Sequence, residues 1–212
     1  MSKVLTLTFA LVLSAFGSNQ AKADAILALG DSLTQGYGLI EQDGLVPQLR
    51  NYLAERDITV RVVNAGVSGD TSAGGLARVE WSLTNDITHM IVALGGNDVL
   101  RGLPPEVTRD NIDQILAIGQ EYGLKMMVVG MLAPANYGAD YKQSFDSLFP
   151  ELAQKYDALY VESFFSAFLT GPDQSPEDVQ PYLQSDGLHP NAEGVEKIVE
   201  FIGPEVQKLL KK

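Results

Sequence analysis

The sequence predicts a doubly wound α/β domain, because apolar runs rich in β-branched residues alternate with amphipathic stretches of helical length. The apolar runs are continuous and do not alternate with polar residues, which is typical of parallel strands covered on both faces. Strands are expected at residues 25–29, 59–63, 89–94, 125–131 and 158–161, joined by right-handed crossovers. Helices are expected at residues 45–55, 73–83, 105–122, 141–156 and 192–210, whereas residues 171–185, with three prolines, are expected to be irregular.

The start of the chain has the pattern of a secretory signal peptide. Lys3 precedes a short apolar run, and the stretch ends in Ala-Lys-Ala at residues 21–23. The apolar run is too short for a comfortable membrane span. We therefore expect a signal peptide over residues 1–23 with cleavage after Ala23, a periplasmic or secreted product, and a single domain over residues 24–212. An uncleaved N-terminal anchor is the alternative.

The composition limits the kinds of partner. The chain has 15 Lys+Arg against 27 Asp+Glu, a formal net charge of −12. Such acidity argues against nucleic acid, which is bound by neutralising its phosphates with basic residues, and against tight docking on an anionic membrane surface. The absence of cysteine excludes disulfides, thiolate metal ligands and a lipidated cysteine. We expect a small-molecule partner, no stable membrane anchor, and a monomer or weak homo-oligomer.

A serine and a histidine are the first candidates for catalysis. Ser32 lies just past the first predicted strand, where a base and backbone N–H groups would make it a nucleophile; a turn or helix N-cap serine is the alternative. Asp186 precedes His189 by three residues, a spacing that lets both side chains face one way on a helical turn. The other histidine, His89, begins the third strand at the opposite end of the sheet and is expected to be solvated. His189 is therefore the candidate base, and Asp186 is the candidate residue that orients it. The alternative for Asp186 is to cap the last helix, a role for which Asn191 also competes.

Two further strands end in residues that can donate hydrogen bonds. Ligands of open α/β sheets bind outside the carboxyl ends of the strands. Gly69 follows the second strand and can present its N–H to an oxyanion, although a tight turn would also use a glycine there. Asn97 follows the third strand and carries a side-chain amide, while Asp98 is expected to brace the loop. Asp31 is expected to stiffen the turn before Ser32 by accepting backbone N–H bonds.

Together these segments resemble the conserved blocks of the GDSL, or SGNH, hydrolase family, in order and in separation. The resemblance covers essentially the whole chain after residue 23, and it implies a three-layer α/β/α sandwich with a five-stranded parallel, flavodoxin-like sheet. It also implies a catalytic triad, an oxyanion hole and no metal or organic cofactor. The matching blocks are Gly30-Asp31-Ser32-Leu33, Gly69, Gly95-Gly96-Asn97-Asp98 and Asp186-x-x-His189. The implied triad is Ser32, Asp186 and His189, and the implied oxyanion donors are Ser32 N–H, Gly69 N–H and the Asn97 amide.

Finer likeness points to a subgroup. Residues 63–65, 68–72, 76–78, 100–105 and 134–138 look like bacterial arylesterases and, equally, like periplasmic acyl-CoA thioesterase/lysophospholipase enzymes. This implies a serine ester hydrolase that cleaves aryl or acyl esters through an acyl-serine intermediate, with thioesters and lysophospholipids as further substrates. A secreted carbohydrate deacetylase of the same family is the alternative. We expect the acyl groove around residues 100–107 and 136–141.

Two rival functions use other chemistry. A metal-dependent phosphoesterase would use Asp31, Asn97, Asp186 and His189 as ligands, but one usable histidine is few for a dinuclear site and no dense ligand spacing is present. A flavodoxin-like binding module would hold a phosphate at residues 30–34. That reading leaves the Asp186 and His189 pair unexplained.

Overall fold

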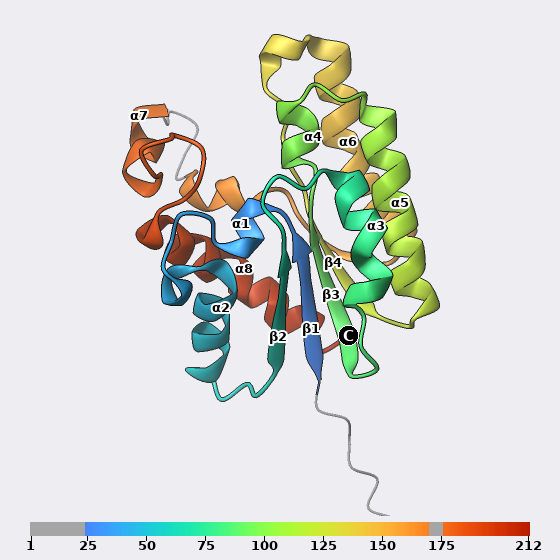
Figure 1. The fold of residues 1–212 in the computed structure, drawn as a ribbon, viewed down its shortest axis with the longest axis vertical. Helices are drawn as coiled ribbons and strands as arrows, with labels where there is room; N and C mark the ends of the chain where they lie inside the picture. The colour runs from blue at the N-terminus through green and yellow to red at the C-terminus, as the bar shows by residue number, and fades with distance from the viewer. Residues whose placement is uncertain (1–23, 170–175) are drawn as a thin grey trace, which may run out of the picture.

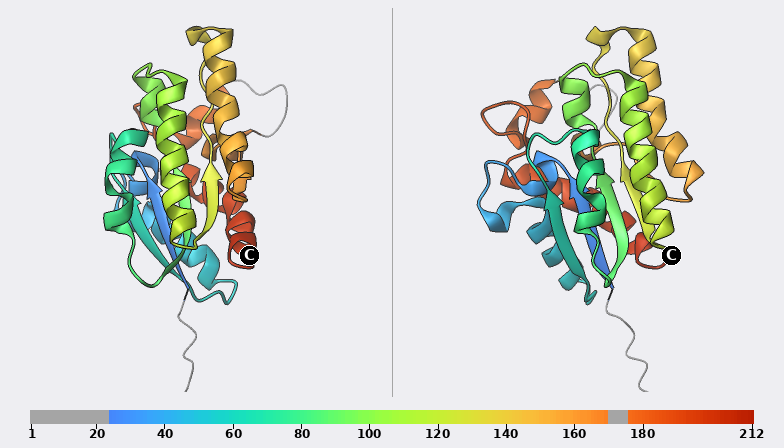
Figure 2. Two further views of the ribbon diagram at one scale, coloured as in Figure 1. Left: turned by 90° about the vertical axis from the view of Figure 1, so that its right-hand side faces the viewer. Right: turned by 45° about the vertical axis from the view of Figure 1, so that its right-hand side comes forward.

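The computed structural model describes residues 24–169 and 176–212 (Figure 1). The predicted signal peptide lies outside the described residues. At the centre is a five-stranded parallel sheet of order β2-β1-β3-β4-β5, with helices on both faces (Figure 2). The predicted α/β class with a five-stranded parallel, flavodoxin-like sheet is therefore confirmed. The strands are β1 (Ala25–Gly30), β2 (Arg61–Gly66), β3 (Ile87–Ala93), β4 (Lys125–Val129) and β5 (Leu159–Val161).

Within residues 24–169 and 176–212, the α-helices comprise the five that were expected and three short ones that were not. The five long helices have bounds within a few residues of the prediction. They are α2 (Leu45–Ala54), α3 (Ser72–Ser82), α5 (Pro105–Glu121), α6 (Ala139–Lys155) and α8 (Ala192–Leu209). The short ones are α1 (Ser32–Gln35), α4 (Gly96–Leu100) and α7 (Pro176–Val179). Because α7 falls in a stretch expected to be irregular, that expectation is wrong for its residues; residues 170–175 of the stretch lie outside the described part.

The central strand β1 is buried on both faces. Leu27 and Leu29 pack with α3, α5 and α6, whereas Ile26 and Ala28 point to the other face and pack with α2 and α8. This alternation follows from the two-residue period of a strand. It explains why the strand reads as a continuous apolar run, since neither of its faces meets water.

His89 corrects one expectation. It lies near the start of β3, at the amino end of the sheet, as expected, but it is only 5% exposed, so the prediction of a solvated side chain is wrong. Its Nδ1 lies 2.8 Å from Thr88 Oγ1. Burial lowers the pKa of His89, and a bond with the Leu209 backbone opposes that shift. The end of α8, remote in sequence, therefore covers this histidine.

The close approach of α1 to β2 depends on Gly66. A Cβ at this position would lie 2.2 Å from the backbone N of Gln35, closer than any real contact. We expect Gly66→Ala to lower the free energy of unfolding by about 1–3 kcal/mol, because the helix that begins with Ser32 must move to accommodate the methyl group. Urea unfolding followed by circular dichroism measures the change. Gly44→Ala, whose Cβ would have its nearest neighbour at 3.3 Å, is the control; an equal cost for both variants would contradict the steric explanation.

The sheet order creates a crevice between β1 and β3. The chain leaves β1 toward β2 on one side and returns to β3 on the other, so the loops after β1 and β3 diverge. The carboxyl ends of β1 and β3 lie at the upper edge of the sheet in Figure 1, next to α1 and α4. In the described part of the chain, no helix combines the length and apolar character needed to cross a bilayer.

Candidate active site

The turn between β1 and α1 places Ser32 at the edge of the sheet. Asp31 is the N-cap of α1, and its Oδ1 accepts the Leu33 N–H at 3.0 Å, as expected of a residue that stiffens the turn. Ser32 is the first residue of this helix, so its own N–H has no acceptor within the helix. Only glycine fits at position 30, because a Cβ there would lie 2.0 Å from Thr34 Oγ1.

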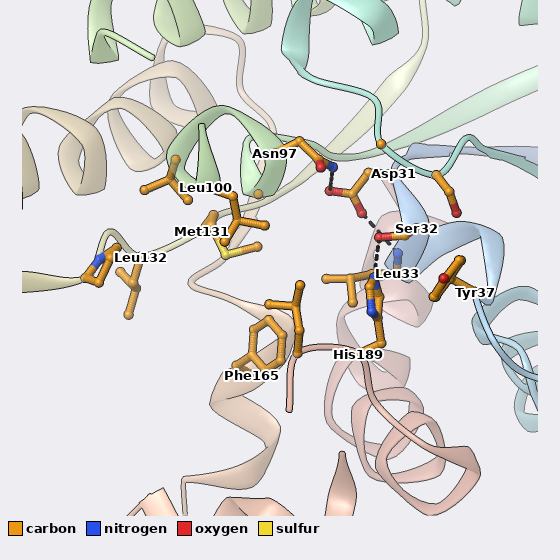
Figure 3. A pocket seen from close by; sticks show the side chains of 16 residues that line it. Asp31, Ser32, Leu33, Tyr37, Asn97, Leu100, Met131, Leu132, Phe165 and His189 are labelled. Carbon is orange, nitrogen blue, oxygen red and sulfur yellow. Dashed lines mark hydrogen bonds between the residues drawn. The ribbon is translucent and has the colours of Figure 1, made fainter. Parts of the chain in front are cut away.

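Ser32, His189 and Asp186 form a continuous hydrogen-bonded chain, of which Figure 3 shows the contact between Ser32 and His189. Ser32 Oγ lies 2.9 Å from His189 Nε2, and His189 Nδ1 lies 2.7 Å from Asp186 Oδ2. The carboxylate can only accept, so it selects the tautomer with the proton on Nδ1. Nε2 then faces the serine hydroxyl as an acceptor, which is the arrangement needed to remove its proton during attack on a carbonyl.

The segment before α8 holds Asp186 and His189 in place. Asp186 Oδ1 accepts the Leu188 N–H at 2.9 Å and the His189 N–H at 3.0 Å. The bonds from the backbone and ring of His189, followed by that from Leu188, lower the pKa of Asp186 to about 2, so this carboxylate is ionised at neutral pH. Asn191, not Asp186, caps α8 by accepting the Gly194 N–H. Asp186 is thereby left to orient the histidine.

Gly69 and Asn97 line the same cavity as Ser32 and His189. Gly69 has a φ of +83°, a conformation that favours glycine, and its carbonyl accepts a bond of 2.7 Å from the Arg101 guanidinium. Asn97 is the second residue of α4, and its Nδ2 lies 3.4 Å from Asp31 Oδ2. All five residues singled out from the sequence therefore meet at one edge, with Asp186 placed behind His189.

A buried carboxylate braces the loop that carries Asn97. Asp98 is fully buried, accepts the Ser72 N–H at 2.8 Å and the Thr108 hydroxyl at 3.1 Å, and also bonds the Ser72 hydroxyl. Since Ser72 begins α3 and Thr108 lies in α5, one side chain ties both helices to α4. The expected bracing role of Asp98 is confirmed.

Arg78 of α3 performs a similar task for the loops after β1 and β2. Its guanidinium donates to the carbonyls of Gly30 at 2.8 Å and Ala65 at 2.7 Å, and it pairs with Asp70 at 2.7 Å. Two donors of this fork reach the ends of the two strands and a third reaches Asp70 in the loop after β2, a geometry that lysine would not reproduce. Arg78 thus holds together the ends of β1 and β2, the strands that position Ser32 and Gly69.

Asp31 is a buried carboxyl group whose ionised form is disfavoured by its surroundings. It is only 3% exposed, and burial raises its pKa to about 6, although the Leu33 N–H, His189 and Asn97 all favour its ionised form. The folded protein therefore binds this proton more tightly than the unfolded chain does. Any group with a raised acid pKa makes the folded state less stable as the pH rises through the interval between the two pKa values.

We expect the variant Asp31→Asn to remove part of the pH dependence of stability. Between pH 4 and pH 7 the wild-type protein should lose roughly 2 kcal/mol of unfolding free energy through this carboxyl, since its pKa rises from 3.8 to about 6 on folding. Urea unfolding of both proteins at pH 4, 5.5 and 7 measures the difference. If the unfolding free energies of the two proteins changed equally with pH over this interval, the folded protein would not bury an ionised Asp31.

A mainly apolar cavity of about 420 Å³ opens beside Ser32 (Figure 3). Its walls come from the segments that follow all five strands and from the segment that carries His189. Leu100 was expected in the acyl groove and does line this cavity, whereas residues 101–107 and 136–141, which were expected there as well, do not line it. The apolar lining residues are Leu33, Val99, Leu100, Met131, Leu132, Pro134, Phe165 and Leu188.

Sequence reasoning also missed Tyr37 and Phe165. The ring of Tyr37 lies 4.6 Å from the His189 ring, between centroids, and Phe165 reaches the cavity from the turn after β5. No local signal distinguishes such residues, because Tyr37 lies in a turn and Phe165 in a short 3₁₀ helix, and the paths of both segments depend on the rest of the fold. An aromatic residue a few positions after a candidate nucleophile was the nearest available clue.

Comparisons with known proteins agree with this geometry. The model of the GDSL-like lipase/acylhydrolase family matches residues 28–197. Esterase TesA of Pseudomonas aeruginosa is 34% identical over 91% of this chain and 92% of its own, and an arylesterase of Vibrio mimicus is 32% identical over 99% and 100%. The crystal structure of the psychrotrophic esterase EstA from a Pseudoalteromonas species, inhibited by monoethylphosphonate, superposes with a TM-score of 0.79 at 28% identity, over 89% of this chain and 99% of that one. This chain therefore belongs to the GDSL-like lipase/acylhydrolase family and is an ester hydrolase.

Proposed function

We propose that this enzyme cleaves carboxylic esters through an acyl intermediate on Ser32. His189 takes the hydroxyl proton as Oγ attacks the carbonyl carbon, and it returns that proton to the leaving alcohol as the ester C–O bond breaks. Water then enters, and His189 activates it to release the acid. The observation that carries the proposal is the hydrogen-bonded chain from Asp186 through His189 to Ser32, which ends in the apolar cavity.

Three donors would stabilise the oxyanion in this mechanism. They are the N–H groups of Ser32 and Gly69 and the side-chain amide of Asn97, which come from the ends of three adjacent strands. Fixed donors aimed at a charge that develops only in the transition state accelerate the chemical step without tightening substrate binding. Arg78, Arg101 and Asp98 support this proposal because they hold the loops that carry the donors.

The cavity favours apolar acyl groups over acetate. Each methylene moved from water into an apolar wall contributes about 0.8 kcal/mol, or roughly fourfold in kcat/KM while the chain still fits. We therefore propose acyl esters, together with acyl thioesters and lysophospholipids that share the same acyl group. A carbohydrate deacetylase, the alternative, would need room for only a methyl group on the acyl side, whereas a cavity of about 420 Å³ lined by Leu100, Met131 and Phe165 lies there.

A panel of p-nitrophenyl esters from acetate to palmitate tests this proposal, run beside palmitoyl-CoA and lysophosphatidylcholine. We expect kcat/KM to rise with chain length from acetate before it levels off, and a fluorophosphonate to label Ser32 stoichiometrically, since a phosphonate also inhibits EstA. Full activity should persist after chelation with EDTA. The highest kcat/KM with acetate would favour the deacetylase, and folded protein that neither reacts nor becomes labelled would overturn the mechanism.

We also propose that the enzyme is exported. Residues 1–23 support this through their basic start, short apolar run and Ala-Lys-Ala end. Mass spectrometry of the protein purified from its producing cell should show an N-terminus at Asp24. A chain that still begins at Met1 would contradict cleavage.

A further inference from the structure

Tyr37 lines the end of the acyl cavity that lies beyond Ser32, away from Leu100 and Met131. In Figure 3, Leu100 and Met131 are on one side of the Ser32 and His189 pair, and Tyr37 is on the other. A substrate whose acyl chain lies against the apolar wall must direct its ester oxygen away from that wall. This oxygen must also approach His189 Nε2, which donates the proton that completes departure. The alcohol part of the bound ester therefore lies next to the Tyr37 ring.

Tyr37 presents a fixed aromatic surface at this place. Its N–H donates to the Ser32 carbonyl at 3.1 Å, and its own carbonyl accepts from Gln184 Nε2 at 2.8 Å, so the backbone is held at both ends. The ring is tilted by 40° against the His189 imidazole and yet is 51% exposed. Aromatic rings that are anchored and partly open to solvent are well suited to bind another ring by offset or edge contacts.

Beyond Tyr37 there is room for a leaving group. A second cavity, of about 440 Å³, shares Tyr37 with the acyl cavity and continues past Gly38 to Arg50 and Asn64. In contrast to the acyl cavity, its walls include polar and charged side chains. A ring lying on Tyr37 would thus have the histidine at one edge and open, polar space at the other.

We propose that Tyr37 forms the leaving-group subsite of this enzyme and that it selects esters of aromatic alcohols. The inference rests on the proposed acyl-Ser32 mechanism, because it takes the position of the leaving oxygen from the protonating role of His189. The competing role for Tyr37 is to shield His189 from water. A shield affects all substrates alike, whereas a subsite affects only those with the matching leaving group.

The test compares benzyl butanoate with cyclohexylmethyl butanoate. Both esters yield the same acyl-enzyme and release primary alcohols of similar acidity, so the ratio of their kcat/KM values reports only how the ring is bound during acylation. We expect the wild-type enzyme to prefer the benzyl ester by about three- to tenfold, Tyr37→Phe to keep that ratio, and Tyr37→Ala to bring it near one. Tyr122→Ala, which removes an exposed tyrosine from the end of α5, should leave the ratio unchanged.

The outcomes distinguish a failure of the Tyr37 subsite from a failure of the acyl-Ser32 mechanism. An unchanged ratio in Tyr37→Ala would overturn the subsite, as would an equal loss of activity toward both esters, which is the result expected of a shield. Fluorophosphonate labelling of Ser32 shows that the variant is folded and retains its nucleophile. If the wild-type enzyme hydrolyses neither ester and is not labelled, the acyl-Ser32 mechanism itself fails, and that result is distinct from a failure of the subsite.

Discussion

Ser32→Ala and His189→Ala are each expected to lower kcat for p-nitrophenyl butyrate by at least about ten-thousandfold, and the double variant should be no slower than the slower single one. The non-additivity has a physical reason. The 2.9 Å contact between Ser32 Oγ and His189 Nε2 joins the proposed nucleophile to the proposed base, so removing either partner should stop the same proton transfer. Steady-state release of p-nitrophenolate by the wild type and all three variants, at saturating ester and corrected for spontaneous hydrolysis, tests this expectation.

The measurement needs a folding control, since loss of activity alone would not distinguish an inactive site from an unfolded one. Both side chains lie at the surface end of the sheet and neither belongs to the core clusters, so unfolding free energies should stay within about 1 kcal/mol of the wild type. If the two single losses multiplied in the double variant, Ser32 and His189 would act in separate steps. The hydrogen-bonded chain would then not be the catalytic unit.

The long elements were predictable because their sequence periods are strong, but β2 shows where local pattern fails. Its last residues, Asn64, Ala65 and Gly66, read as a loop, yet they pair in parallel register with Ala28, Leu29 and Gly30 of β1. Pairing with a buried neighbour overrides the weak strand propensity of small and polar residues. The helices α1 and α4 were missed for another reason, since four or five residues are too few to display a helical period.

The candidate catalytic residues could be located from the sequence, whereas the walls of the cavity could not. Ser32, Gly69 and Asn97 each follow a predicted strand, and topology alone brings the carboxyl ends of parallel strands to one edge. Phe165 and Tyr37 instead reach the site from a short 3₁₀ helix and a turn, whose course is set by contacts with distant parts of the chain. The burial of His89 under the end of α8 was unpredictable for the same reason.

Asn97→Ala is expected to lower kcat by about a hundred- to a thousandfold while KM changes by less than about threefold, because an oxyanion donor acts on charge that is absent from the bound ester. The amide nitrogen is positioned by α4 and by its contact with Asp31, and the loop around it is braced by Asp98. Steady-state kinetics with p-nitrophenyl butyrate measure the loss in kcat. The affinity for a butyl boronic acid, which forms a tetrahedral adduct on serine, should fall by a similar factor.

Ser68→Ala is the matched control, because Ser68 lines the same cavity and its hydroxyl bonds the Gln35 side chain instead of facing Asp31. Its removal should change kcat by less than about threefold, as expected of a group that does not meet the developing charge. A rise in KM for Asn97→Ala with kcat unchanged would show that the amide binds the ground state. Parallel loss of rate and boronate affinity in Asn97→Ala, but not in Ser68→Ala, would instead place the third donor of the oxyanion hole on α4, where the fold joins the sheet edge to the acyl cavity.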